Sequence, residues 1–248
     1  MEFIDSHCHL DAFRNYEEVI PRALKADVKA MITSGCSGKN NQKTLQIAEK
    51  YPNLIFPVLG VAPQEAIDME SFERQLSFIK QNRDKIIGVG EIGLDFHWAK
   101  TPTQKTKQQE CFEIFLEYAL SEKLPLVIHS REAEKEVLEA VMRAGAERVL
   151  LHCFSGALSL AESAAEHGFL LSIPPTPSAA RERIIKHIPL ENLLLESDAP
   201  YLGKEPAEVR SSARLIEGVK GVGVEEISRV TTNNCITLFN LRCLHGGD

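Results

Sequence analysis

The sequence predicts an α/β protein with a (β/α)8 fold, a TIM barrel formed as a single domain by residues 1–248. Short apolar runs alternate with longer amphipathic segments from end to end, so the hydrophobic period changes repeatedly between 2 and about 3.6 residues. Eight strand-like runs are present, which is the number that closes such a barrel. The length matches the roughly 250 residues of a one-domain barrel, and no linker divides the chain.

The expected strands are short apolar runs, each followed by polar or glycine-containing segments. In chain order they are Glu2–Ser6, Val28–Ser34, Ile55–Gly60, Ile86–Gly90, Pro125–His129, Arg148–His152, Gly168–Ile173 and Asn192–Glu196. An open doubly wound sheet is the alternative, but that fold usually carries a glycine-rich nucleotide loop after its first strand. Here His7-Cys8-His9 occupies that place.

The expected helices fill the intervals between the strands and close the chain, with apolar residues at helical spacing. They are Tyr16–Ala26, Asn41–Lys50, Ser71–Asn82, Gln104–Glu122, Ala133–Arg143, Leu158–His167, Ser178–His187, Ala207–Lys220 and Val224–Asn240.

Composition excludes several classes of protein. The longest apolar stretches are strand-sized, so no membrane span is expected, and no secretory signal is visible at the N-terminus. Six cysteines without regular spacing indicate reduced thiols and a cytoplasmic protein. The net charge of −7 disfavours an extended duplex-binding surface, so a nucleic acid substrate would have a small footprint. Nothing implies an obligate protein partner, and we expect a monomer.

Potential metal ligands gather where the expected strands end. His7 and His9 are two residues apart, so an extended chain points both imidazoles to one side and Cys8 to the other. The βα loops of a barrel converge at the carboxyl ends of its strands, which is where catalytic groups lie. The ligand-type residues at these ends are His7, His9, Glu91, His129, His152 and Asp198.

Mixed imidazole and carboxylate donors suit first-row divalent ions and allow a two-metal site. Glu91, from the middle of the barrel wall, is the candidate to bridge two ions, and a water between them becomes hydroxide near neutral pH. Asp198 would bind one ion and accept a proton from that water. The sequence does not choose among Mg²⁺, Mn²⁺ and Zn²⁺.

Each residue taken alone also has a structural explanation. A histidine ending an apolar run is often a hydrogen-bonded core residue, and an aspartate before Ala-Pro often starts a turn. Ligand-type residues at five of eight strand ends favour the metal interpretation. Asp5 is a candidate partner for an imidazole N–H, Arg131 for a substrate phosphate, and Cys8 and Cys153 are expected to pack in the core.

Several segments resemble the TatD family of metal-dependent deoxyribonucleases, within the amidohydrolase superfamily. They are Asp5-Ser6-His7-Cys8-His9-Leu10, Gly90-Glu91-Ile92-Gly93-Leu94-Asp95, Ile128-His129-Ser130-Arg131-Glu132-Ala133, Leu151-His152-Cys153-Phe154-Ser155-Gly156, Glu196-Ser197-Asp198-Ala199-Pro200-Tyr201-Leu202 and Asn234-Cys235-Ile236-Thr237-Leu238-Phe239. The resemblance implies hydrolysis of phosphodiesters, typically in DNA. It also implies one ion on His7, His9, Glu91 and Asp198 and a second on Glu91, His129 and His152.

Two departures from the family pattern concern the substrate. The family usually has G-x-H-P after the third strand, where this chain reads Gly60-Val61-Ala62-Pro63. Residues 203–206 also stand where the family usually has a longer loop containing Arg and Asn.

Three functions therefore compete. The first is a phosphodiesterase acting on DNA ends or short single strands. The second is a metal-dependent hydrolase of carboxylic esters or amides, for example an aminoacyl-ester deacylase, which the departures favour. The third is a barrel with a structural metal, which the cysteine-free ligand set disfavours.

Overall fold

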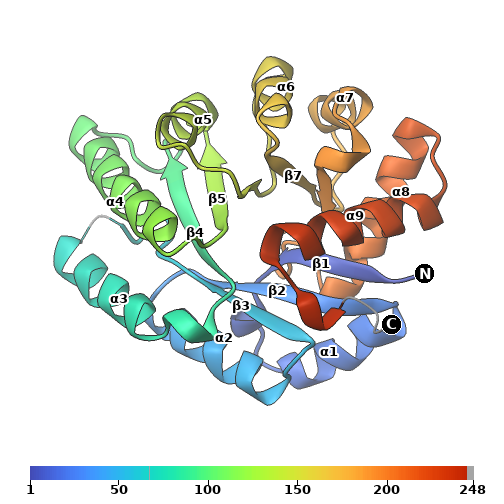
Figure 1. The fold of residues 1–248 in the computed structure, drawn as a ribbon, viewed down its shortest axis with the longest axis horizontal. Coiled ribbons are helices and arrows are strands. Elements are labelled where there is room, and N and C mark those ends of the chain that lie inside the picture. The colour runs from blue at the N-terminus through green and yellow to red at the C-terminus, as the bar shows by residue number, and fades with distance from the viewer. Residues whose placement is uncertain (67, 245–248) are drawn as a thin grey trace.

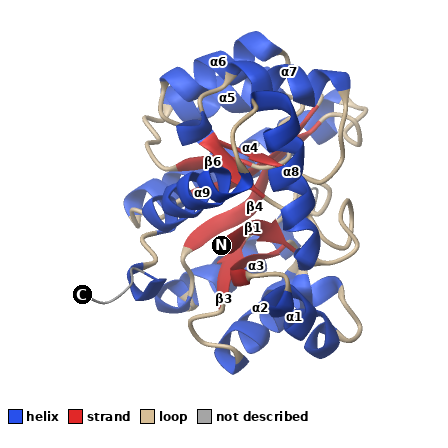
Figure 2. Cartoon of the chain, turned by 90° about the vertical axis from the view of Figure 1, so that its right-hand side faces the viewer, coloured by secondary structure: helices blue, strands red, loops and turns tan. Residues whose placement is uncertain are grey.

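The eight apolar runs pair side by side as parallel strands of one sheet, in the order β1 to β8. In the computed structural model, which describes residues 1–66 and 68–244, this sheet curves into a nearly closed barrel surrounded by helices (Figure 1). A view turned by 90° shows the strands inside and the helices outside (Figure 2). The predicted (β/α)8 fold is confirmed.

The strands match the expected runs closely, except for β4. They are β1 (Phe3–Cys8), β2 (Val28–Gly35), β3 (Ile55–Leu59), β4 (Gly88–Asp95), β5 (Leu126–Arg131), β6 (Val149–Leu151), β7 (Leu170–Ile173) and β8 (Leu193–Leu195). The sequence predicted that β4 ends at Gly90, but the strand continues to Asp95 alongside β5. Gly93 permits this pairing, because its φ is 139° and a Cβ there would lie 2.0 Å from the carbonyl oxygen of His129.

The helices also begin and end within a few residues of their predicted limits. They are α1 (Tyr16–Lys25), α2 (Gly38–Lys50), α3 (Met69–Gln81), α4 (Pro102–Ser121), α5 (Glu134–Arg143), α6 (Leu158–Glu166), α7 (Ala179–His187), α8 (Val209–Lys220) and α9 (Val224–Phe239). A capping box between Thr101 and Gln104 starts α4, and the left-handed Gly221 ends α8.

The core has two parts, separated by the barrel wall. The larger part packs the outward side chains of the strands against the surrounding helices. The smaller part fills the barrel with inward residues of the strands, such as Ile32, Val127 and Leu194, together with residues of α9. Asn234 of α9 donates to the carbonyl of Leu193, the first residue of β8. Helix α9 therefore closes the N-terminal end of the barrel and leaves the opposite end free.

The barrel seam lies at that opposite end. The N–H of Asp198, beyond β8, donates to the carbonyl of His7 at 3.0 Å, and the N–H of His9 donates to the carbonyl of Ala199 at 2.8 Å. These two bonds join the first and last strand regions and fix His7, His9 and Asp198 relative to one another.

The structure bears on two predictions made from composition, one about membrane-spanning helices and one about the state of the cysteines. Within residues 1–66 and 68–244, no helix combines the length and apolarity needed to cross a membrane. All six cysteines are unpaired.

Candidate metal centre

The six residues predicted as ligands converge at the carboxyl ends of the strands. Five of them are buried, and the imidazole of His129 is 19% exposed. Two lie on or directly after β1, one each on β4 and β5, one after β6 and one after β8. These are His7, His9, Glu91, His129, His152 and Asp198.

Glu91 stands at the centre of this group, and its two carboxylate oxygens face different histidines. Oε2 lies 3.4 Å from Nε2 of His9 and 3.6 Å from Nε2 of His7. Oε1 lies 2.9 Å from Nδ1 of His129 and 3.3 Å from Nε2 of His152. The carboxylate thus separates two clusters of donor atoms and belongs to both.

The first cluster contains His7, His9 and Asp198. Nε2 of His7 and Nε2 of His9 are 3.1 Å apart, and Oδ1 of Asp198 lies 3.8 and 3.4 Å from them. The other ring nitrogens are held by Ser34, whose hydroxyl lies 3.3 Å from Nδ1 of His7 and whose carbonyl oxygen lies 3.0 Å from Nδ1 of His9. Both Nε2 atoms are therefore turned toward the common centre.

The second cluster contains His129 and His152, whose Nδ1 and Nε2 atoms are 3.3 Å apart. Carboxylates stand behind both rings. Nε2 of His129 lies 3.1 Å from Oδ2 of Asp95, and Nδ1 of His152 lies 3.7 Å from Oε2 of the fully buried Glu196. A carboxylate behind an imidazole fixes its tautomer and makes the opposite nitrogen a stronger ligand.

The spacing of the donors fits bound divalent ions. An ion at roughly 2.0–2.2 Å from each donor holds neighbouring donors about 3–3.5 Å apart. The distances among the donors are 3.1–3.8 Å in the first cluster with Oε2 of Glu91, and 2.9–3.3 Å in the second with Oε1. Nitrogen and oxygen donors of this kind suit first-row divalent metals.

The charges of the site favour ionised carboxylates. Burial alone would raise the pKa of Glu91, but the charge of His152 and hydrogen bonds from His129, His152 and His7 hold it well below its ordinary value. Burial lowers the pKa of His152, but Glu91 and Glu196 outweigh it and raise that pKa to about 10. The ring of His152 also stacks on that of His7 at 3.9 Å. Burial and this neighbour lower the pKa of His7.

The prediction for Asp5 was wrong in its detail. Its buried carboxylate does not contact an imidazole; it accepts hydrogen bonds from the backbone N–H of His7 and from the backbone and hydroxyl of Ser197. Burial raises the pKa of Asp5 to about 8. Asp5 ties the strand that carries His7 to the segment that carries Asp198, so it acts on the backbone of the site.

The cysteines near the ligands behave in two ways. Cys8 faces the helix layer and is buried there, as strand alternation predicted, whereas Cys153 is half-buried near Arg181. Cys36 was not predicted from the sequence; its Sγ lies 3.4 Å from Nδ1 of His9 and 3.7 Å from Oε2 of Glu91. Burial raises the pKa of Cys36 to about 12.

A cavity of about 510 Å³ opens directly above the cluster. Arg131 and Ala62 both line it, Ala62 at the position where the family pattern has histidine. The short segment 203–206 lies beside α1, where Glu205 pairs with Arg22 at 2.5 Å. Trp98 and Tyr201 complete the rim of the cavity, and the sequence analysis assigned neither of them a role.

Asp95 was likewise not predicted as a site residue, although the sequence contained a signal for it. Glu91 and Asp95 are four residues apart on one strand, so their side chains share a face. The error in the predicted end of β4 hid this relation. Besides His129, Asp95 accepts hydrogen bonds from the Gln64 amide at 2.7 Å and the Trp98 backbone at 3.1 Å.

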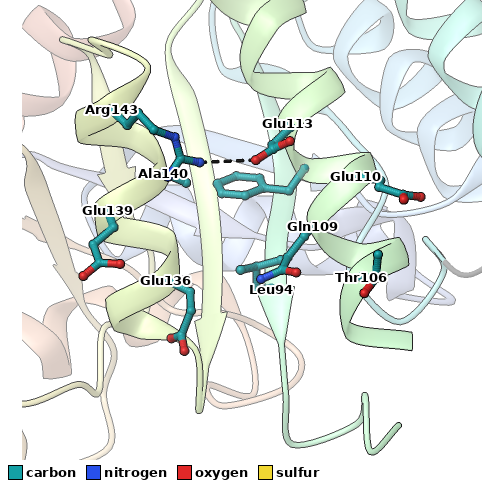
Figure 3. Close-up of a pocket in the computed structure, with 10 residues that line it drawn as sticks. Leu94, Thr106, Gln109, Glu110, Glu113, Glu136, Glu139, Ala140 and Arg143 are labelled. Atoms are coloured by element: carbon teal, nitrogen blue, oxygen red, sulfur yellow. Dashed lines mark hydrogen bonds and ion pairs between the residues drawn. The ribbon is translucent and has the colours of Figure 1, made fainter. Parts of the chain in front are cut away.

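A second cavity, of about 350 Å³, lies on the helical layer between α4 and α5 (Figure 3). Four glutamates line it, and one of them, Glu113, pairs with Arg143 at 3.2 Å. None of the six ligand-type residues lines this cavity.

Comparison with known proteins gives one consistent family. Residues 4–240 match the family model described as TatD related DNase. The chain is 34% identical to Deoxyribonuclease TATDN3 of Homo sapiens, over 95% of this chain and 94% of that protein. It is also 34% identical to the uncharacterized metal-dependent hydrolase YabD of Bacillus subtilis, over 96% and 98%. The crystal structure of the TatD homologue YJJV from Escherichia coli superposes with a TM-score of 0.87 at 28% identity, over 96% and 98% of the two chains.

Proposed function

The chain belongs to the TatD family of metal-dependent deoxyribonucleases, and from this premise we propose that it hydrolyses phosphodiester bonds at DNA ends or in short single strands, with two divalent ions. The observation that carries the proposal is the division of the Glu91 carboxylate between two donor clusters. When bound, two such ions supply positive charge to a phosphoryl oxygen and lower the pKa of a water molecule.

In this proposal the six converging residues hold the ions. His7, His9 and Asp198 would hold one ion, and His129 and His152 would hold the other. Glu91 would be shared between the two. Asp95 orients His129 from behind, as Ser34 does for the first pair, and the charge of Glu196 lies 3.7 Å behind Nδ1 of His152.

Asp198 is the residue we propose for proton transfer. Its Oδ1 faces His7 and His9, which leaves Oδ2 to accept the proton of the attacking water. Burial raises the pKa of this carboxyl, but the hydrogen bond from His9 and the charges of His7 and His152 outweigh burial and lower the pKa. The group is therefore ionised at neutral pH, as a proton acceptor must be.

Arg131 is the residue we propose for holding the substrate phosphate. It lies at the end of β5, exposed, on the wall of the cavity that contains the ligands. A guanidinium donates paired hydrogen bonds to phosphate oxygens, and it neutralises charge that increases as the water attacks.

The variant Asp198→Asn tests the central role. Loss of a general base typically lowers the rate by about 10²- to 10⁴-fold, so cleavage of a 3′-labelled oligonucleotide should fall by this order in Mg²⁺, Mn²⁺ and Zn²⁺ alike. The control is Asp68→Asn, which keeps an oxygen to cap α3 and lies outside the cavity lining. Undiminished cleavage by Asp198→Asn would refute the role of Asp198.

A panel of aminoacyl esters, assayed beside the oligonucleotide, tests the substrate class. Hydrolysis of the esters alone would overturn the proposal of a nuclease. We also propose that the protein acts as a monomer in the cytoplasm. The six unpaired thiols support a reducing compartment, and sedimentation of the metal-loaded protein tests the monomer.

A further inference from the structure

Two large aromatic side chains are exposed at the mouth of the cavity. Trp98 is 60% exposed and Tyr201 is 64% exposed, and both line the cavity above the ligand cluster. Among the residues that the structure describes, only three other large apolar side chains are exposed to a comparable degree, and none of these lines the cavity. Aromatic rings left in water beside a catalytic centre indicate a surface that a ligand covers.

Trp98 lies on the side of the second cluster. Its backbone N–H donates to Oδ1 of Asp95 at 3.1 Å, and the other oxygen of Asp95 holds His129. Its ring meets the ring of His97 edge to face, with centroids 5.6 Å apart. The tryptophan is therefore positioned by the same carboxylate that orients a ligand histidine.

Tyr201 is mounted on the side of the first cluster. Its backbone N–H donates to the carbonyl of Asp198 at 2.8 Å. Its ring meets that of His9 edge to face, with centroids 5.0 Å apart and an angle of 72°. Each cluster therefore has one aromatic side chain beside it.

From these positions we propose that Trp98 and Tyr201 form an aromatic clamp, which stacks on unpaired nucleobases flanking the phosphate to be cleaved. The inference rests on the proposed function and names its substrate more narrowly as single strands or frayed ends. Bases in a duplex are already stacked and paired, so they cannot reach both rings. Stacking on aromatic side chains is a general means of binding single strands without sequence preference.

The charges of the cavity favour such a clamp. Its lining contains the acidic residues Glu65, Glu91, Asp95 and Asp198, but only one permanent cation, Arg131. Together with the net charge of −7, this lining gives little electrostatic attraction to a polyanion beyond the bound ions. Stacking supplies affinity that does not depend on the charge of the protein.

The chain provides its own reporter for a direct test, because Trp98 is its only tryptophan. Metal-loaded protein is titrated with a short single-stranded DNA whose phosphorothioate linkages slow hydrolysis, and tryptophan emission is recorded. We expect saturable quenching by this strand, and no quenching by an abasic strand of equal length or by a blunt duplex. Equal binding of the abasic and the normal strand would overturn the clamp.

Matched variants separate stacking from structural effects. Tyr201→Leu and Trp98→Leu should each raise the KM for single-stranded DNA by roughly 10- to 100-fold with a smaller change in kcat, whereas Tyr201→Phe and Trp98→Phe should stay near the wild type. Unchanged KM in both leucine variants would also overturn the clamp.

Failure of the clamp and failure of the nuclease function give different results. Metal-dependent cleavage of abasic and normal strands with equal KM would leave the nuclease standing and remove the clamp. Quenching by single strands without hydrolysis of any DNA would leave the clamp standing and remove the nuclease.

Discussion

Replacement of Asp95 by asparagine should weaken one metal site and spare the other. The Asp95 carboxylate accepts hydrogen bonds from the Nε2–H of His129, the amide of Gln64 and the backbone of Trp98. Asparagine has one acceptor oxygen, so it cannot accept all three bonds in any orientation. If the amide NH2 takes the place of Oδ2, the proton on Nε2 of His129 loses its partner, and if it takes the place of Oδ1, it faces the backbone N–H of Trp98. In either orientation the negative charge behind His129 is lost.

The expected loss of metal affinity follows from the position of the Asp95 carboxylate behind the ligand His129. Loss of such a partner typically costs about 10- to 100-fold in metal affinity, or roughly 1.4–2.7 kcal/mol. Asp95 forms a hydrogen bond with His129 of the second cluster. Among the described residues, none of its hydrogen bonds or ion pairs reaches His7, His9 or Asp198. Metal binding at the second cluster should therefore weaken, and binding at the first cluster should not change.

Isothermal titration calorimetry of the metal-free protein with Mn²⁺ or Zn²⁺ resolves the two events. The control is Asp68→Asn, which makes the same change at an aspartate outside the cavity lining. If Asp95→Asn weakens both sites equally, or neither, the assignment of Asp95 to the second cluster is wrong.

Two further predictions concern protons and the barrel core. Burial lowers the pKa of His152, but Glu91 and Glu196 raise it to about 10, so a bound ion must displace a proton at pH 7. Metal affinity should therefore rise between pH 6 and 9, by about tenfold per pH unit for each proton released. Calorimetry in buffers of different ionisation enthalpy counts the released protons. A metal affinity independent of pH would contradict this prediction. Phe239→Ala in α9 should lower the free energy of unfolding, measured in urea, by about 3–5 kcal/mol, because the ring fills the closed end of the barrel. The control is Leu24→Ala at an exposed position, which should change that free energy by less than about 0.5 kcal/mol. Equal effects of the two variants would refute the role of α9.

The order and kind of the elements could be read from the sequence because each is a local property. The change of hydrophobic period marked the strands and helices to within a few residues. Strand β4 was the exception, since glycines interrupt its pattern and only pairing with β5 extends it to Asp95.

The ligand-type residues could also be identified from the sequence, because a parallel barrel brings all carboxyl ends of its strands to one rim. Alternation along β1 directed His7 and His9 to the same side, and the structure places their Nε2 atoms 3.1 Å apart. No such rule applies to Asp5, whose partners follow from the closure of the barrel at Ser197, distant in sequence.

The barrel, the parallel direction of its strands and the chemical character of its rim follow from the sequence alone, because all three depend on periodicity and topology. The folded chain sets how the rim is divided: which oxygen of Glu91 faces which histidines, and that Asp95, Glu196 and Ser34 stand behind the rings. It alone also brought Trp98 and Tyr201, far apart along the chain, to one cavity. The reason is that these relations depend on distances of a few ångströms between different strands, which spacing along one chain does not encode.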